Sequence, residues 1–340
     1  MKLAVPALLL IGCSGAAAVN SANTDNATTK VAPHVQVAAA IVEPAVPVPA
    51  SAPASFEGST WAGFGVANCS YLAPSSDFIG DDDAIDVVWH FHAGQMATAD
   101  MKASEMRTVF VSCGYGIGTG GYSSNFDDPN RFSGMMRSLL RTVSFKAKRD
   151  VHLGHFALAS WSAGFAAVNR ILGSSEWYAK TDAVLLFDSL HSQYIDLPED
   201  LKAGAGAAAS KKVAARGADH VDTKMLRRFI RFASDAAAGK KRMVITHSSI
   251  VPPDYASTSE ATAALVREVD VPSQVSAETT AVPFGLPTMT PSVVVDAGNL
   301  HVRGFRGIGP HDHFDHLHLI GEALRSWIVP GWYSPGSERH

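Results

Sequence analysis

The stretch His155-Phe-Ala-Leu-Ala-Ser-Trp-Ser-Ala-Gly164 decides the fold of this chain. It begins with an apolar run suited to a buried strand, and apolar side chains at helical spacing follow it over 165–172. Between the two stands Ser162, with the small residues Ser160 and Gly164 two positions before and after it. Small residues there allow strand and helix backbones to approach closely at a sharp turn. The pattern predicts a buried strand, a strained turn and a helix, with Ser162 at the apex.

Buried strands and helices alternate along the rest of the chain. Runs of apolar and β-branched residues predict strands at 84–92, 108–113, 155–159, 183–187, 242–246 and 292–296. Apolar spacing predicts helices at 131–147, 163–173, 222–238, 257–268 and 314–328. Strands that are apolar throughout and separated by helices are typical of a parallel sheet covered on both faces. The expected fold class is therefore α/β, with a doubly wound, mostly parallel sheet and helices on both faces.

Over residues 84–330, this order of elements and the small-X-Ser-X-Gly turn at 160–164 resemble the α/β-hydrolase superfamily. The resemblance implies a serine hydrolase that cleaves an ester or related acyl bond in a small molecule or a polymer. It implies no cofactor and no metal, and it makes Ser162 the nucleophile. Ser160 departs from the family, which usually has glycine at that position. The family order along the chain is nucleophile, acid and histidine.

The histidine that accepts the Ser162 proton follows the last strand in that family. The segment His311-Asp-His-Phe-Asp-His-Leu-His318 offers several candidates there. His313 is the first candidate because it stands just before the predicted final helix, and His316 is the alternative. His318 falls inside that helix and is expected to be structural.

An acid must orient this histidine and stabilise its imidazolium form. Asp188 is the candidate because it directly ends the strand predicted at 183–187. Many members of the family carry the acid one strand later, and Asp254 in the corresponding loop is the alternative. The competing interpretation of either aspartate is a side chain that caps its own loop.

The oxyanion hole of the family combines two backbone N–H groups. One belongs to the residue after the nucleophile, here Ala163. The other comes from the turn after an early strand, here Ala93 or Gly94, where glycine allows close approach of the backbone. The glycine-rich segment 114–121 lacks the Lys-Ser/Thr ending of a phosphate-binding loop and is interpreted as the rim of the cleft.

The N-terminus has the pattern of an export signal. One lysine precedes the apolar run Leu3–Ile11, which is too short to cross a bilayer. Leu10-Ile-Gly-Cys13 resembles the lipobox of bacterial lipoproteins. That resemblance implies a lipid on Cys13, membrane attachment through it, and an exported protein of the cell envelope, at the outer membrane in a Gram-negative host. The expected organisation is a signal peptide at 1–12, an Ala/Pro-rich tether at 13–56 and an α/β-hydrolase-like domain at 57–340.

Two further cysteines, Cys69 and Cys113, remain beside Cys13. In an exported protein they are candidates for a disulfide. The alternative is a pair of separate buried thiols, because spacing along the chain does not decide whether two cysteines can reach one another. The sequence leaves both interpretations open.

Positive charge gathers in residues 202–242, which hold eleven Lys or Arg and three Asp, whereas the whole chain has a net charge of −4. Apolar residues at helical spacing within this segment predict an amphipathic helix with a basic outer face. That face is either solvated or in contact with anionic lipid or polysaccharide. No nucleic-acid-binding motif accompanies the charge, so no nucleic-acid partner is expected. The oligomeric state is not predicted.

Two rival functions remain. A protein with this fold can be a catalytically inactive binding protein of the envelope, because fold alone does not establish activity. The histidines and aspartates of 311–318, together with His90 and His92, could instead serve a metal-dependent hydrolase. The H-E-x-x-H spacing of zinc hydrolases is absent.

Overall fold

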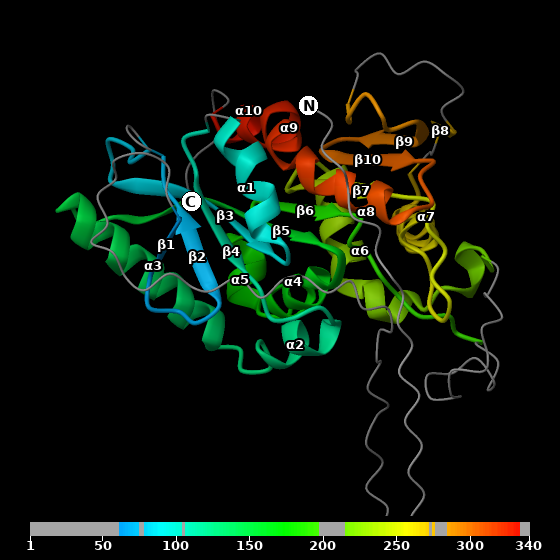
Figure 1. The fold of residues 1–340 in the computed structure, drawn as a ribbon, viewed down its shortest axis with the longest axis horizontal. Helices are drawn as coiled ribbons and strands as arrows, with labels where there is room; N and C mark the ends of the chain where they lie inside the picture. The colour runs from blue at the N-terminus through cyan, green and yellow to red at the C-terminus, as the bar shows by residue number, and fades with distance from the viewer. Residues whose placement is uncertain are drawn as a thin grey trace, which may run out of the picture. The chain divides into compact units, whose positions relative to one another are not determined.

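The computed structural model describes residues 61–74, 78–103, 106–196, 215–271, 274–275 and 284–333. The expected signal peptide, the tether with Cys13 and residues 202–214 of the basic segment lie outside the described residues. A ten-stranded sheet in the order β1-β2-β4-β3-β5-β6-β7-β10-β9-β8 runs through the described part (Figure 1).

The strands differ in direction between the centre and the edges of the sheet. They are β1 (Trp61–Gly63), β2 (Cys69–Leu72), β3 (Ala84–Phe91), β4 (Val109–Cys113), β5 (His152–Trp161), β6 (Ala183–Phe187), β7 (Arg242–His247), β8 (Gln274–Val275), β9 (Pro291–Ala297) and β10 (Leu300–Phe305). The neighbours β4, β3, β5, β6, β7 and β10 are parallel. The remaining pairs are antiparallel. The predicted mostly parallel sheet is confirmed.

The sheet separates two hydrophobic layers because alternate side chains of each strand point to opposite faces. In β5, Phe156 and Leu158 belong to one layer, and Ala157 and Ala159 belong to the other. The first layer is completed by helices α3 (Arg131–Ala147), α4 (Phe165–Ile171), α5 (Ser175–Lys180), α6 (Thr223–Ala237) and α7 (Thr258–Val269). The second is completed by α1 (Gly94–Ala103), α9 (Ile320–Ala323) and α10 (Val329–Trp332) (Figure 1). Helices therefore cover both faces, as expected.

The helix predicted at 314–328 is wrong as a single element. The chain forms α8 (Pro310–Asp315), a 3-10 turn at His316–Leu319, α9, and a π-helical turn at Leu324–Ile328 that leads into α10. Pro310 occupies the first turn of α8, so the helix begins before the predicted start. Near the break, the Gly321 N–H donates to the Asp100 carboxylate in α1 rather than continuing a regular helical ladder. This tertiary hydrogen bond supplies an acceptor for an N–H in the first turn of α9, where the interrupted helix provides none.

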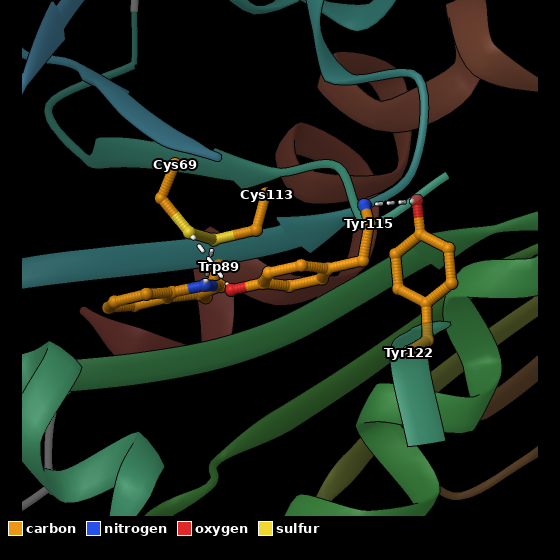
Figure 2. Close-up of a disulfide and its surroundings, with 5 residues drawn as sticks. All are labelled: Cys69, Trp89, Cys113, Tyr115 and Tyr122. Atoms are coloured by element: carbon orange, nitrogen blue, oxygen red, sulfur yellow. Dashed lines mark hydrogen bonds between the residues drawn. A yellow bond between two sulfur atoms is a disulfide. The ribbon is translucent and has the colours of Figure 1, made fainter. Parts of the chain in front are cut away.

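The structure pairs Cys69 with Cys113 in a disulfide between the neighbouring strands β2 and β4 (Figure 2). The Trp89 indole Nε1 lies 3.3 Å from Cys113 Sγ, and the Tyr115 hydroxyl lies 3.4 Å from Cys69 Sγ. The two cysteines are direct partners in the strand register, a relationship that the spacing along the chain does not reveal.

The basic amphipathic helix is α6. Its apolar side chains Leu226, Phe229 and Phe232 are buried in the core, while Lys224 and Arg227 are exposed. Two of its arginines have partners on neighbouring helices. The Arg228 guanidinium donates to Asn169 Oδ1 at 3.0 Å, and the Arg231 guanidinium lies 3.9 Å from the centre of the Tyr178 ring. None of the described helices has the length and apolar composition needed to cross a membrane.

Candidate active site

The candidate residues follow the carboxyl ends of neighbouring parallel strands. Ser162 follows β5, Asp188 follows β6, Ala93 follows β3, and His313 lies in α8 after β10. Because parallel strands end at the same edge of a sheet, these residues share that edge, where α/β proteins place their ligands. The adjoining helix α2 (Thr119–Ser124) begins inside the glycine-rich segment that was expected to be only a cleft rim.

Ser162 stands in the strained turn that the sequence predicts. Its φ is +48°, a left-handed conformation that is costly for a residue with a Cβ, and a 3-10 turn at Ser162–Gly164 connects β5 to α4. At Gly164 a Cβ would lie 2.3 Å from the Phe91 carbonyl oxygen, so only glycine fits against β3. Such strain persists where the surrounding structure enforces it, which is common at functional sites.

Ser160, which replaces the usual glycine, has a structural partner. Its hydroxyl lies 2.8 Å from the Ser189 hydroxyl, and Ser189 Oγ donates to the Ser162 carbonyl at 2.8 Å. Serine at this position therefore ties the turn after β5 to the loop after β6, which begins with Asp188. The departure from the family pattern is accommodated without disturbing the turn.

His313 and Asp188 are hydrogen-bonded to one another. His313 Nδ1 lies 2.7 Å from Asp188 Oδ2, while Asp188 Oδ1 accepts from the Ser248 N–H at 2.9 Å and from the Thr258 hydroxyl. Burial by itself would raise the pKa of Asp188, but the neighbouring His316 and His313 and the Ser248 N–H hold that pKa well below its usual range. Asp188 is therefore a buried carboxylate suited to stabilising an imidazolium.

Asp254 and His316, the alternatives to this pair, have other contacts. Asp254 has no hydrogen bond to a histidine among the described residues, and its Oδ1 is buried without a partner there. His316 is fully buried, its Nδ1 lies 2.6 Å from the Thr246 hydroxyl, and burial lowers its pKa to about 4. His318 is exposed. His313 itself lies inside α8 rather than before a helix, because α8 starts at Pro310.

The turn after β3 has the geometry of a backbone donor site. His92 and Ala93 both have positive φ, at +78° and +52°, and the His92 N–H donates to the Cys113 carbonyl at 3.0 Å. Gly94 packs against β4 so closely that a Cβ would lie 1.6 Å from Ser112 Oγ. The Ala93 N–H donates to no backbone carbonyl of the described residues.

A contact that the sequence did not indicate connects this turn to His313. The His92 ring stacks on Trp161 with ring centres 5.1 Å apart and planes at 11°. The ring centre of Trp161 in turn lies 4.3 Å from that of His313, and Trp161 Nε1 donates to the His313 carbonyl at 2.8 Å. Trp161, next to the candidate nucleophile, therefore packs between the turn and the candidate base.

Tyr122 in α2 holds the other edge of the His92 ring. Its hydroxyl lies 2.7 Å from His92 Nδ1 and accepts from the Tyr115 N–H at 3.1 Å (Figure 2). Burial, together with the nearby His313, lowers the pKa of His92 to about 4, so His92 is neutral at pH 7. The only sequence signal for this contact was the aromatic side chain in a glycine-rich segment.

A cavity of about 120 Å³ is lined partly by residues that follow β7 and β10 in the chain. Its lining includes Ser248, whose N–H binds Asp188, and His316, together with Arg306 and Asp312. Among the described residues, no group of three or more His, Cys, Asp or Glu side chains is placed to hold a metal ion. His90, one of the histidines considered for such a group, has its Nε2 2.6 Å from the His92 carbonyl oxygen.

No protein-family model and no curated protein matches this chain. Among solved structures, a monoacylglycerol lipase of Paleococcus ferrophilus is 11% identical with a TM-score of 0.37, over 71% of this chain and 94% of that chain. An acylaminoacyl peptidase of Pyrococcus horikoshii is 9% identical with a TM-score of 0.41, over 79% of this chain and 40% of that chain. The chain thus spans less than half of the peptidase.

An S-formylglutathione hydrolase from Agrobacterium tumefaciens is 11% identical with a TM-score of 0.38, over 77% of this chain and 88% of that chain. The fold is α/β-hydrolase-like. The strand order and the strand-turn-helix unit at Ser162 support that description independently of these distant likenesses. The roles of individual residues rest on the geometry of this chain alone.

Proposed function

We propose that this chain is a serine hydrolase that cleaves an ester or related acyl bond. Ser162 is the nucleophile, His313 the general base and Asp188 the acid that orients it. The observation that carries the proposal is the 2.7 Å contact between His313 Nδ1 and Asp188 Oδ2, on the sheet edge where Ser162 has a positive φ. With Nδ1 bonded to the acid, His313 Nε2 is left to accept the serine proton.

The mechanism follows from these roles. Ser162 Oγ attacks the carbonyl carbon while His313 Nε2 takes its proton, and the N–H groups of Ala163 and Ala93 bind the oxyanion that forms. The imidazolium then protonates the leaving alcohol or amine, and an acyl-serine remains. Water then attacks the acyl-serine in the same way, with His313 as the base, and the carboxylic acid product is released. Asp188 stays ionised throughout and stabilises the imidazolium.

Labelling with a fluorophosphonate tests the proposal. The wild type should be labelled, and Ser162→Ala should not be labelled while keeping its melting temperature. Ser234→Ala, which removes an exposed hydroxyl on α6, is the matched control and should be labelled like the wild type. An unlabelled wild type whose esterase activity is abolished by a chelator would favour the metal-dependent alternative. An unlabelled and inactive wild type would favour the binding protein.

We further propose that the enzyme is exported and held at the cell envelope through a lipid on Cys13. The lipobox-like sequence Leu10-Ile-Gly-Cys13 motivates this, and the Cys69–Cys113 disulfide is compatible with an oxidising compartment. Substrates would then be acyl compounds that reach the periplasm or cell surface.

A further inference from the structure

His191 is a polar side chain at the candidate site that the mechanism does not use. It stands three residues after Asp188, in the loop that follows β6. Its ring centre lies 5.2 Å from that of Phe165 and 5.6 Å from that of Tyr255. Phe165 in turn stands three residues after Ser162. These contacts place His191 beside the elements that carry the nucleophile and the acid.

The His191 ring has no hydrogen-bond partner among the described residues. Both ring nitrogens are buried, although part of the side chain remains accessible. Asp254 Oδ1, adjacent in sequence to Tyr255, is also buried without a partner there. Because buried polar groups in proteins are nearly always hydrogen-bonded to protein or to ordered water, two such groups in adjoining loops mark a place where a partner, either a water or a ligand group, completes the hydrogen bonding.

The electrostatic surroundings define the chemistry of that partner. Burial lowers the pKa of His191 to about 4, with Asp188 opposing this and His313 adding to it. The imidazole is therefore neutral at pH 7 and offers one donor and one acceptor. Asp254 offers an acceptor. A hydroxyl both donates and accepts, so it suits this set, whereas a carboxylate would be repelled by Asp188 and Asp254.

We propose that Phe165, His191, Asp254 and Tyr255 form a subsite for a hydroxyl-bearing substituent next to the scissile acyl bond. The two aromatic rings enclose the carbon skeleton, and His191 hydrogen-bonds the hydroxyl. This inference rests on the proposed serine-hydrolase function and names its substrate class as hydroxylated esters. A site built around an unpaired polar group discriminates strongly against analogues that lack the matching hydroxyl.

Paired esters that differ by one hydroxyl test the subsite. The acyl arm compares 4-nitrophenyl 3-hydroxybutyrate with 4-nitrophenyl butyrate, and the alcohol arm compares 3-hydroxypropyl butyrate with propyl butyrate. The wild type should favour the hydroxylated ester by about 10-fold or more in kcat/KM in one arm, which then identifies the side of the bond that enters the subsite. A 4-nitrophenyl succinate, which carries a carboxylate, should be a poorer substrate than the butyrate.

Variants of the subsite residues test whether the subsite causes the preference for the hydroxylated ester. His191→Phe should bring the ratio of the two rates to about 1, and His191→Asn, which keeps a donor and an acceptor, should retain part of it. Asp254→Ala tests the same subsite from the adjoining loop if His191→Phe does not fold. His318→Phe, at an exposed position outside the site, is the matched control and should keep the wild-type ratio.

The readout is the ratio of rates, so it separates the subsite from the catalytic proposal. A wild type that hydrolyses both esters equally in both arms contradicts the subsite and leaves the serine hydrolase intact. A preference that survives both His191→Phe and Asp254→Ala also contradicts it. A wild type that hydrolyses none of the esters and escapes fluorophosphonate labelling overturns the proposed function, and the subsite with it.

Discussion

The hydroxyl of Tyr122 lies 2.7 Å from Nδ1 of His92, and so joins helix α2 to the positive-φ turn that carries the candidate oxyanion donor. His92 is also the residue whose ring stacks on Trp161. The turn is therefore held on both sides of one imidazole ring. Because an oxyanion hole acts only in the transition state, a loosened turn should slow the chemical step rather than weaken substrate binding.

Tyr122→Phe removes only this hydroxyl and should lower kcat by about 10-fold, with KM changed by less than about 2-fold. The matched control is Tyr178→Phe, which removes a hydroxyl in α5 that donates to Asp235 at 2.6 Å. The control should keep kcat. Steady-state kinetics on one ester gives both parameters. Equal kcat values for the two variants would show that the Tyr122 contact is merely structural.

Single and double variants of the proposed triad should be strongly non-additive. Ser162→Ala and His313→Ala should each lower kcat by about 10⁴-fold or more, and the double variant should be little worse, because the residues act as a unit. His316→Ala should cost much less in kcat, since its ring is bonded to Thr246 rather than to the acid. An inactive His316→Ala beside an active His313→Ala would transfer the role of base to His316.

Asp188→Asn should lower kcat by about 10⁴-fold, because an amide stabilises neither the correct tautomer of His313 nor its imidazolium. Asp254→Asn should leave kcat within about 3-fold on an ester without a hydroxyl substituent, since Asp254 has no bond to His313 among the described residues. Both values come from steady-state kinetics at pH 7. The reverse pattern would make Asp254 the acid.

The same carboxylate should make stability depend on pH. The pKa of Asp188 is lower in the folded protein than in the unfolded chain, where it is about 3.9. Its ionised form therefore contributes stability above about pH 4, and that contribution is lost as the pH falls through the lower folded-state value. The difference in unfolding free energy between wild type and Asp188→Asn should narrow from pH 5 to pH 2 in urea titrations. A difference independent of pH would contradict this origin.

Removal of the disulfide should destabilise the domain without abolishing its fold. Cys69 and Cys113 are 44 residues apart, and closing a loop of that length in the unfolded chain contributes about 2–4 kcal/mol. The double variant Cys69→Ala/Cys113→Ala should therefore unfold at lower denaturant than the oxidised wild type. A reductant should shift the wild type toward the variant and leave the variant unchanged. A wild type insensitive to reductant would argue against the pairing.

The lipid anchor proposed at Cys13 predicts a modified N-terminus. The protein isolated from its native host should have an intact mass that corresponds to a chain beginning at Cys13 with acyl groups, and it should partition with membranes. Cys13→Ser should prevent the attachment and release the domain into the soluble fraction. A mass without acyl additions would contradict the anchor.

Much of the fold follows from local sequence. The strands β3, β4, β6 and β7 were predicted nearly to their ends because strands buried on both faces consist mostly of apolar and β-branched residues. Helix α3 was predicted over its full length, and α7 begins within one residue of its predicted start, at a capping box formed by Ser257 and Glu260. The turn at Ser162 was predictable as well, because its small flanking residues have a local steric cause.

Other elements depended on contacts that no local pattern reveals. β10 was missed because it is not continuously apolar: Arg303 is buried there through two hydrogen bonds with Asp296 of β9. Strands β1 and β2 were missed because they have only three and four residues, too few to show a periodic pattern.

Some residues of the candidate site were likewise placed by the sequence, and others only by the tertiary structure. The sequence by itself placed Ser162 and Asp188 at one edge of a parallel sheet, because each directly follows a predicted buried strand, but it left Asp254 open as the acid. Only the tertiary structure decided which histidine meets Asp188, since the turn of α8 against the sheet brings His313 to the acid and His316 to Thr246. The physical reason is that backbone periodicity is set by near neighbours, whereas the pairing of side chains from separate elements is set by how those elements pack.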